Sequence, residues 1–182
     1  MDNTITDTLS DLLKKRYSPR SFSNEAVSED TLKRIFDAAR LAPSSYNEQP
    51  WRFIYATKAN TEEYQRLLSC LNEFNQGWAE DAPVLIVGVA KKAFSSNGKI
   101  NRHAWYDTGA AVGFMSLKAT EEDLFVHQMA GFLPEKAIEV LNIPEDYEPI
   151  VMMALGYLGN SDRPDKGRKP LDEIAFRGMW QQ

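Results

Sequence analysis

The chain has 182 residues, of which 43% are hydrophobic and 26% are charged, and its formal net charge is −5. This composition is ordinary for a globular protein, so it argues against disordered chains, fibres and membrane spans, and the net charge disfavours a nucleic-acid or anionic membrane surface. The N-terminal segment has no apolar signal-peptide core, and a single cysteine, Cys70, excludes an internal disulfide and fits a reducing compartment. We therefore expect a cytoplasmic protein.

The first part of the chain predicts two helices followed by a strand. The spacing of apolar residues predicts a helix from about Thr6 to Lys15. A second helix is predicted to begin after Ser28, whose hydroxyl can cap it, and to end before Pro43, because the residue before a proline is biased out of the helical region. A polar stretch with turn chemistry follows, and Trp51 to Thr57 has the composition of a strand.

The rest of the chain predicts three more helices and two more strands. The helices run from Thr61 to about Phe74, from His103 to Ala119, and from Pro134 to a point before Pro144, since proline suits a first helical position and disfavours continuation. The strands run from Val84 to Ala90, whose continuous apolar run indicates burial on both faces, and from Ile150 to Leu158.

These elements do not alternate as regular βαβ units, which favours an α+β domain with helices packed on a small central sheet. We treat residues 1–182 as a single domain. The tail, residues 159–182, lacks strong periodicity, so we expect it to be disordered or to wrap around something.

Two basic stretches are candidates for an anion site. The sequence "RYSPRSF" places Arg16 and Arg20 around Ser18, and arginine forks with a hydroxyl suit the acceptor oxygens of a phosphate. A solvated basic loop is the alternative, and for this stretch alone it is the better interpretation. The run "KGRK" from Lys166 to Lys169 is either a solvated segment or the second part of the same anion pocket.

A polar loop, "PSSYNEQPW", begins at Pro43 and carries two hydroxyls and two carboxamides. Such groups can offer donors and acceptors to the edge of a heteroaromatic ring. An ordinary helix-to-strand connection is the alternative interpretation. Other candidates are weaker, because His103 and His127 lack the spacing of metal ligands and Cys70, among leucines, is expected to be a buried inert thiol. We predict no metal site.

Taken together, these stretches resemble the FMN-dependent nitroreductase family over nearly the whole chain. "RYSPRSF" is similar to its N-terminal signature, "LAPSSYNEQPWRFI" to its most specific motif, and "DAPVLIVGVA" to its central strand. "HQMAGF" resembles its glycine turn, and "MMALGYLG" with "KGRKPLDEI" resembles its last strand and basic tail. The resemblance implies a mainly antiparallel sheet flanked by helices, in an intertwined homodimer with FMN at the interface and the C-terminal tail reaching the partner.

The resemblance also implies roles for individual residues. It assigns FMN binding to Arg16, Tyr17, Ser18, Arg20, Pro43, Ser44, Ser45, Asn47, Asn75, Ala130, Gly131, Lys166 and Arg168, and the substrate side to Tyr46 and Phe74. The arginines would hold the phosphate and ribityl chain, and the loop from Pro43 to Asn47 would contact the flavin from the other subunit. The backbone at Gly131 would face flavin N5, and Asn75 would approach the pyrimidine edge. No acid or base is assigned, because the flavin carries the chemistry.

Three features depart from the family pattern. Trp78 stands where members often carry a lysine or arginine, and the loss of that cation should lower the reduction potential of the flavin. Glu121, Glu122 and Asp123 form an unexpected acidic run that obscures the end of the preceding helix, and Leu133 replaces a common aspartate.

The leading functional hypothesis is an NAD(P)H-dependent flavin oxidoreductase that reduces nitroaromatics, quinones or similar electron-poor small molecules. Reductive dehalogenation and flavin-consuming chemistry remain open within the same fold. The alternatives are a flavin-binding or sensor protein with weak or no turnover, and a flavin-free interaction protein, which the basic set disfavours because desolvated cations without an anion are costly. The sequence does not distinguish NADH from NADPH, one-electron from two-electron reduction, or the physiological acceptor.

Overall fold

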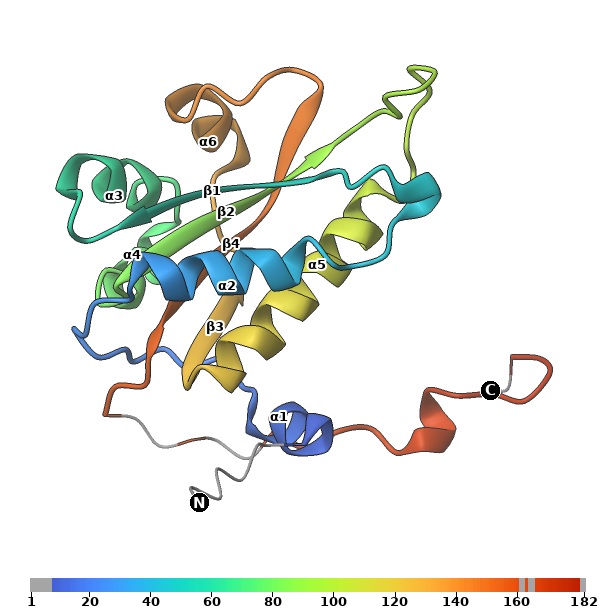
Figure 1. The fold of residues 1–182 in the computed structure, drawn as a ribbon, viewed down its shortest axis with the longest axis horizontal. Helices are drawn as coiled ribbons and strands as arrows, with labels where there is room; N and C mark the ends of the chain where they lie inside the picture. The colour runs from blue at the N-terminus through green and yellow to red at the C-terminus, as the bar shows by residue number, and fades with distance from the viewer. Residues whose placement is uncertain (1–7, 161–162, 164–165, 181–182) are drawn as a thin grey trace.

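One four-stranded antiparallel sheet, in the order β1-β2-β4-β3, lies at the centre of the structure (Figure 1). The computed structural model describes residues 8–160, 163 and 166–180. The strands are β1 (Trp51–Thr57), β2 (Val84–Lys91), β3 (Leu124–Met129) and β4 (Tyr147–Tyr157), and the helices are α1 (Leu9–Lys15), α2 (Glu29–Ala39), α3 (Thr61–Leu68), α4 (Glu73–Ala79), α5 (Ala104–Glu121) and α6 (Pro134–Val140). Short 3₁₀ turns cover Ser45–Asn47 (η1) and Leu171–Glu173 (η2). The predicted α+β class with a mainly antiparallel sheet is confirmed.

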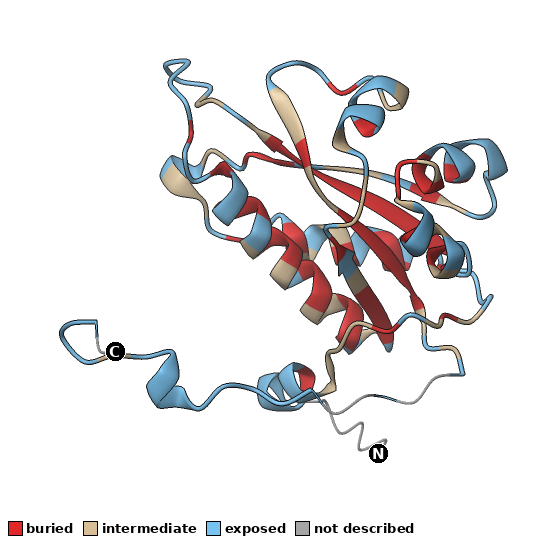
Figure 2. Cartoon of the chain, turned by 180° about the vertical axis from the view of Figure 1, so that it is seen from behind, coloured by how far each residue is buried: buried red, intermediate tan, exposed pale blue. Residues whose placement is uncertain are grey.

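Each face of the sheet is covered by helices and carries its own hydrophobic core, because alternate residues of a strand point to opposite faces. Leu85 and Val87 of β2 pack with the core that includes residues of α3, α4 and α6. Ile86, between them, packs with the core formed with α2 and α5. Figure 2 shows the strands and the inner side of α5 as the buried centre of the molecule. This double burial explains the continuous apolar run of β2.

The first two helices both begin at a capping residue, and only the second cap was predicted. Ser28 accepts a hydrogen bond from the backbone N–H of Thr31, which confirms the predicted cap of α2. Helix α1 begins only at Leu9, because Thr8 caps it in a capping box with Asp11. The predicted start at Thr6 lies outside the described residues. The predicted strand from Trp51 to Thr57 is confirmed as β1.

Two predictions of secondary structure are wrong. The helix predicted from Thr61 to Phe74 is split into α3 and α4, because Asn72 has extended backbone angles and its side chain accepts from the backbone N–H of Asn75 as an N-cap. Cys70 is therefore not within a helix, although it is buried as expected. Strand β3 was not predicted, because it is a short edge strand that starts directly after Asp123, which reverses the chain with a φ of 60°.

The remaining elements extend the predicted ones. Helix α5 continues to Glu121, and β4 begins at Tyr147, before the predicted Ile150. The third predicted helix is confirmed as α6. Beyond β4, the described part of the tail leads away from the sheet and is exposed almost throughout (Figures 1 and 2). No helix in the described part of the chain is long and apolar enough to cross a membrane.

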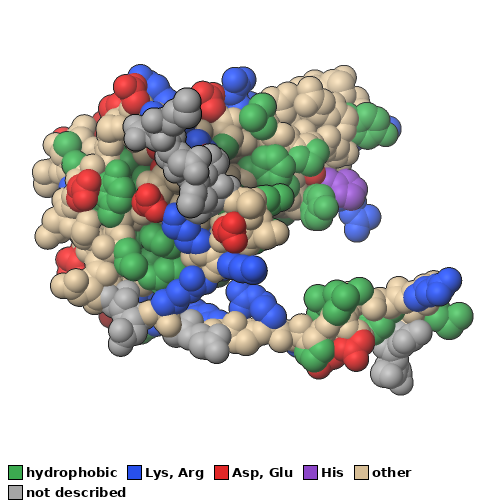
Figure 3. Space-filling view, turned by 60° about the horizontal axis from the view of Figure 1, so that its bottom comes forward, with side chains coloured by type: hydrophobic (Ala, Val, Ile, Leu, Met, Phe, Trp, Pro, Cys, Tyr) green, Lys and Arg blue, Asp and Glu red, His purple; other side chains and the backbone are tan. Residues whose placement is uncertain are grey.

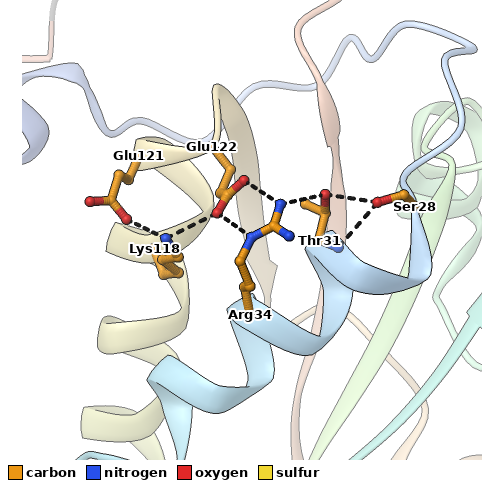
Figure 4. A network of polar contacts seen from close by, with 6 residues as sticks. All are labelled: Ser28, Thr31, Arg34, Lys118, Glu121 and Glu122. Carbon is orange, nitrogen blue, oxygen red and sulfur yellow. Dashed lines mark hydrogen bonds and ion pairs between the residues drawn. The ribbon is translucent and has the colours of Figure 1, made fainter. Parts of the chain in front are cut away.

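The unexpected acidic run after α5 joins this helix to α2 (Figure 4). Arg34 of α2 donates from Nε and Nη2 to the two carboxylate oxygens of Glu122, each at 2.8 Å, and Lys118 lies 3.0 Å from the same carboxylate. Hydrogen bonds from Arg34, and next from Lys118, lower the pKa of Glu122 to about 2. The Glu122 carboxylate therefore stabilises the end of α5 by binding it to α2.

We expect Glu122→Gln to destabilise the fold by about 1 kcal/mol at neutral pH, the upper end for a bidentate pair near the surface. Because the folded pKa of Glu122 lies below its ordinary value of 4.5, its contribution is present above that value and is lost as the pH falls towards about 2. Urea unfolding at pH 7 and pH 3 measures this, with Glu62→Gln as a matched exposed control. Equal destabilisation at both pH values would contradict the assignment.

Candidate functional site

The segment from Arg16 to Arg20 follows α1 and is fixed against β3. The Tyr17 ring meets Phe125 edge-on, with ring centroids 5.0 Å apart, and the carbonyl oxygen of Pro19 lies 2.7 Å from Nδ1 of His127. The Tyr17 hydroxyl is buried and has no hydrogen-bond partner among the described residues. Tyr17 thus packs the segment onto the sheet, while the side chain of Arg20 is left exposed and that of Ser18 is half-buried.

The tail brings further cations to this segment. Partial burial, and then the neighbouring Arg168 and Arg163 charges, lower the pKa of Arg16. The guanidinium of Arg163 lies over the Tyr17 ring, 5.1 Å from its centroid, and donates to the carbonyl oxygen of Lys14. Figure 3 shows Lys and Arg side chains gathered where the body of the molecule faces the tail. We call Arg16, Arg20, Arg163, Lys166 and Arg168 the cationic cluster.

The cationic cluster has the electrostatics of an anion site. Among the described residues, no member of the cluster forms an ion pair with a carboxylate. Like charges repel one another, so a multivalent anion that pairs with several of these groups would stabilise the arrangement. The structure therefore brings together the two basic stretches that are far apart in sequence.

His127 lies beside the cluster, in the strand that the sequence did not predict. Its Nδ1 donates to the carbonyl oxygen of Pro19, because a carbonyl can only accept. Its ring lies 4.5 Å from the Trp78 ring, centroid to centroid. Burial, opposed by the Pro19 hydrogen bond and reinforced by the charges of Arg20 and Lys166, lowers the pKa of His127.

We expect the His127 signal in an NMR titration to have a pKa below the ordinary histidine value, and addition of inorganic phosphate to raise it by neutralising Arg20 and Lys166. Since the folded pKa is depressed, His127 contributes stability above the ordinary value of 6.5 that is lost as the pH falls through its folded pKa. The chain has 2 histidines, so His103→Gln assigns the signals. A pKa of His127 insensitive to both phosphate and Arg20→Ala would contradict its place beside the cluster.

A second part of the candidate site is the turn after β3. The carbonyl oxygen of Gly131 accepts from the Asn72 backbone N–H at 3.2 Å and from Asn75 Nδ2 at 2.9 Å. A Cβ atom on Gly131 would lie only 2.6 Å and 2.7 Å from the side-chain nitrogens of Asn75 and Asn72. The backbone N–H of Gly131 donates to no described residue, and the preceding Ala130 is exposed. The turn thus presents an unsatisfied peptide N–H next to a fixed amide.

Asn75 itself is buried and already engaged. In addition to its bond to Gly131, its Oδ1 accepts from the indole N–H of Trp78 at 3.1 Å. Its amide retains one further donor and acceptor capacity, since each amide group can make more than one hydrogen bond. Phe74, the preceding residue, is exposed, and the Arg20 guanidinium lies 5.1 Å from the centroid of its ring. The structure thus places Asn75, Gly131 and Phe74 beside the cationic cluster.

The loop from Pro43 to Asn47 is held at the start of α5. The Ser45 backbone N–H donates to Oδ2 of the buried Asp107 at 3.0 Å, and the Ser44 hydroxyl accepts from the Gln49 backbone N–H at 3.0 Å. Tyr46, Asn47 and Gln49 have φ between 51° and 54°, a left-handed conformation that costs free energy in residues other than glycine. The strained loop leaves the Tyr46 side chain 92% exposed, and Pro43 and Asn47 are exposed as well.

Within one chain, the loop from Pro43 to Asn47 and the start of the cationic cluster are tied to opposite ends of α5. The loop is bonded to Asp107 in the first turn of this helix, while Lys15 beside the cluster pairs with Asp123 just after its last turn. The helix has 18 residues. At 1.5 Å per residue its ends are separated by about 27 Å. One chain therefore does not bring the loop and the start of the cluster together (Figure 1).

Sequence reasoning missed four residues of this arrangement: Asn72, Asp107, His127 and Arg163. Asn72 followed by Glu73 is a helix-start signal, and it could have identified Asn72, whose backbone N–H donates to the Gly131 carbonyl oxygen. The other three have no local signal, because their roles arise from contacts with residues that are 62 or more positions away.

Comparisons with known proteins agree with this geometry. A family model described as "Nitroreductase family" matches residues 13–157. A Thermus thermophilus protein named NADH dehydrogenase is 27% identical, over 89% of this chain and 92% of the relative. A crystal structure described as an oxidoreductase containing FMN is 31% identical, covers 96% of this chain and 94% of its own, and superimposes with a TM-score of 0.87. A nitroreductase family protein from Clostridium difficile 630 is 29% identical, with 96% and 100% coverage and a TM-score of 0.79.

Proposed function

The chain belongs to the Nitroreductase family, and on this premise we propose that it is an FMN-dependent oxidoreductase. It takes hydride from NAD(P)H and reduces electron-poor small molecules such as nitroaromatics or quinones. The names of similar proteins support both parts, since one is called an NADH dehydrogenase and another is an oxidoreductase containing FMN. An Oxygen-insensitive NADPH nitroreductase of Helicobacter acinonychis is 35% identical over 42% of this chain.

The cationic cluster is the observation that carries the proposal. FMN ends in a phosphate monoester, which bears a charge of about −1.5 to −2 at neutral pH and offers three acceptor oxygens. Four cations of the cluster can pair with such a group, because among the described residues none of them forms an ion pair with a carboxylate. They are Arg16, Arg20, Lys166 and Arg168. The half-buried Ser18 hydroxyl lies between the two arginines in the chain and can donate to the phosphate or ribityl oxygens.

The turn at Gly131 fits the isoalloxazine end of the same cofactor. When bound, FMN would supply the redox chemistry, which is the exchange of hydride between the donor and the acceptor. The Gly131 N–H can donate to the flavin, and Asn75 holds the turn through its bond to the Gly131 carbonyl oxygen. Phe74 is exposed beside Arg20 and can cover one side of the cofactor.

A homodimer explains why the loop from Pro43 to Asn47 lies far from the cluster. In the proposed enzyme a second copy supplies this loop, with Tyr46, to the flavin held by the first copy. The outer side of α5 supports such pairing, because Tyr106 and Phe114 are exposed and Gly109 and Gly113 permit close approach. The described tail also exposes large apolar side chains, which are Leu171, Ile174, Met179 and Trp180.

A flavin-binding protein with weak turnover is the second candidate, and Trp78 is the observation that favours it. Its indole N–H is bonded to Asn75 and its ring lies between Phe22 and His127, so this position supplies no cation to reduced flavin. A smaller stabilisation of the reduced form would lower the reduction potential.

Two observations on the purified protein test these candidates. A visible flavin absorption band, retained on gel filtration, is expected after addition of FMN. Anaerobic NADH or NADPH should bleach that band, and a nitroaromatic or quinone should restore it. A protein that remains colourless with FMN would exclude both candidates, while a yellow protein that neither nicotinamide bleaches would favour the second.

A further inference from the structure

The connection between β2 and α5 forms a short hairpin that projects beyond the sheet (Figure 1). Residues 92–103 are called the β2–α5 arm here. Ala93 pairs with Ile100 in an isolated antiparallel bridge, and the Phe94 backbone N–H donates to the carbonyl oxygen of Lys99 at 2.9 Å. The turn is closed by Gly98, whose φ of 69° suits glycine and whose N–H donates to the Phe94 carbonyl oxygen. The hydrogen-bonded backbone makes the arm an ordered element.

The arm is attached to the loop that carries Tyr46. The Phe94 and Tyr46 rings meet edge-on, with centroids 5.8 Å apart and an interplanar angle of 88°. Ser95 donates to one carboxylate oxygen of Glu48 from its backbone N–H at 2.9 Å and from its hydroxyl at 2.6 Å. These hydrogen bonds lower the pKa of Glu48 and keep its carboxylate charged. The arm and the loop that carries Tyr46 therefore form one surface.

The arm itself is basic, and the acidic residues next to it are Glu148, which accepts from the Trp105 indole N–H, and Asp146, whose carbonyl oxygen accepts from the Lys92 backbone N–H. Lys92, Lys99 and Arg102 are exposed, and the sequence contains no Asp or Glu between Lys91 and Asp107. Within the described part of the chain none of the three forms an ion pair. The nearby Glu48 carboxylate is bonded to Ser95 instead, with Lys91 3.9 Å away.

The backbone places two of these cations near the contact between the arm and the loop. Lys99 is the cross-strand neighbour of Phe94, and such neighbours have Cβ atoms about 5 Å apart, so Lys99 lies one residue away from the Tyr46 contact. Arg102 lies two residues before the start of α5, in the same chain segment as Asp107, which holds the loop backbone at Ser45. Exposed cations on a surface that also carries the exposed Tyr46 ring suit a ligand with both phosphates and flat rings.

We propose that the β2–α5 arm binds the phosphate groups of the dinucleotide hydride donor, and that Lys99 and Arg102 favour NADPH over NADH. The inference rests on the proposed function, in which Tyr46 lines the place where the donor's nicotinamide meets the flavin. The two donors differ by one phosphate monoester, which adds a charge of about −1.5 to −2 and three acceptor oxygens. A basic surface beside Tyr46 therefore discriminates between them by charge.

The test compares three donors with the FMN-loaded protein: NADPH, NADH and the uncharged 1-benzyl-1,4-dihydronicotinamide, which has no phosphate. We expect Lys99→Ala/Arg102→Ala to lower kcat/KM for NADPH by about tenfold relative to the benzyl donor, which corresponds to the loss of one good charged contact. The kcat/KM for NADH should fall less. Raised ionic strength should also reduce the preference of the wild-type protein for NADPH over NADH, because salt screens the charges. Lys33→Ala/Arg40→Ala removes the same charge from the exposed face of α2 and is the matched control.

An unchanged NADPH-to-NADH ratio in the arm variant would overturn the proposal. Equal loss with all three donors would also overturn it, because the arm would then act on the assembly of the site instead of on phosphate. A wild-type protein that retains FMN and oxidises none of the three donors would contradict the proposed function itself, and the benzyl donor separates this failure from a failure of phosphate recognition.

Discussion

FMN is expected to be lost on purification from the Arg16→Ala/Arg20→Ala variant, while its fold is retained. Each arginine can make charged hydrogen bonds to the phosphate, and losing one such bond costs about 1.5–3 kcal/mol, or roughly ten- to a hundredfold in affinity. Removal of both should therefore weaken binding by at least about a hundredfold if the losses add. Fluorescence titration of the apoprotein with FMN measures the dissociation constant.

The folded structure itself should tolerate this change. Among the described residues neither arginine forms an ion pair, and removing two neighbouring cations relieves repulsion within the cluster. Arg16→Lys/Arg20→Lys should show an intermediate affinity, because lysine keeps the charge and loses the planar fork. Arg40→Ala, an exposed arginine paired with Asp37 on α2, is the control. Unchanged flavin content in the double alanine variant would refute the cluster as the phosphate site.

Gly131→Ala is expected to destabilise the protein by about 1–3 kcal/mol, the range for forcing a methyl group into occupied space. The added Cβ would lie 2.6 Å from Asn75 Nδ2 and 2.7 Å from Asn72 Nδ2, well inside contact distance. Both side chains have hydrogen-bonding roles, since Asn72 caps α4 and Asn75 holds the Gly131 carbonyl oxygen. They cannot move without breaking those bonds. Chemical unfolding measures the loss, and FMN titration should show weaker binding.

Gly77→Ala provides the matched control for this substitution. Gly77 lies in α4 near the same turn, and a Cβ there would meet nothing within 4 Å. Alanine in a helix is favoured over glycine by roughly 0.8–1 kcal/mol, so this variant should be more stable. If Gly131→Ala were as stable as the wild type, the clamp of Asn72 and Asn75 on the turn would be more yielding than the contacts imply.

The sequence alone determined those elements whose signals are local. Ser28 and Pro43 bounded α2, the continuous apolar run marked β2, and Pro134 marked the start of α6, because capping, proline geometry and burial on two faces act within a few residues. The quoted motifs also sufficed to predict the family and the α+β fold. The prediction of secondary structure failed at Asn72, where a capping residue divides an otherwise helical run. It also failed at β3, a short edge strand that follows Asp123, whose backbone is left-handed.

Only the tertiary structure decided which of these motifs meet. It brought the tail cations to Arg16 and Arg20. It also joined Gly131 to Asn75 and His127 to Pro19 by hydrogen bonds between residues that are 56 and 108 positions apart. It also tied the loop from Pro43 to Asn47 to the first turn of α5 and Lys15 to Asp123 after its last turn, at opposite ends of this helix. Spacing along a chain carries no information about these distances, because they are set by how the helices pack on the sheet, and that packing depends on buried contacts made by the whole chain at once.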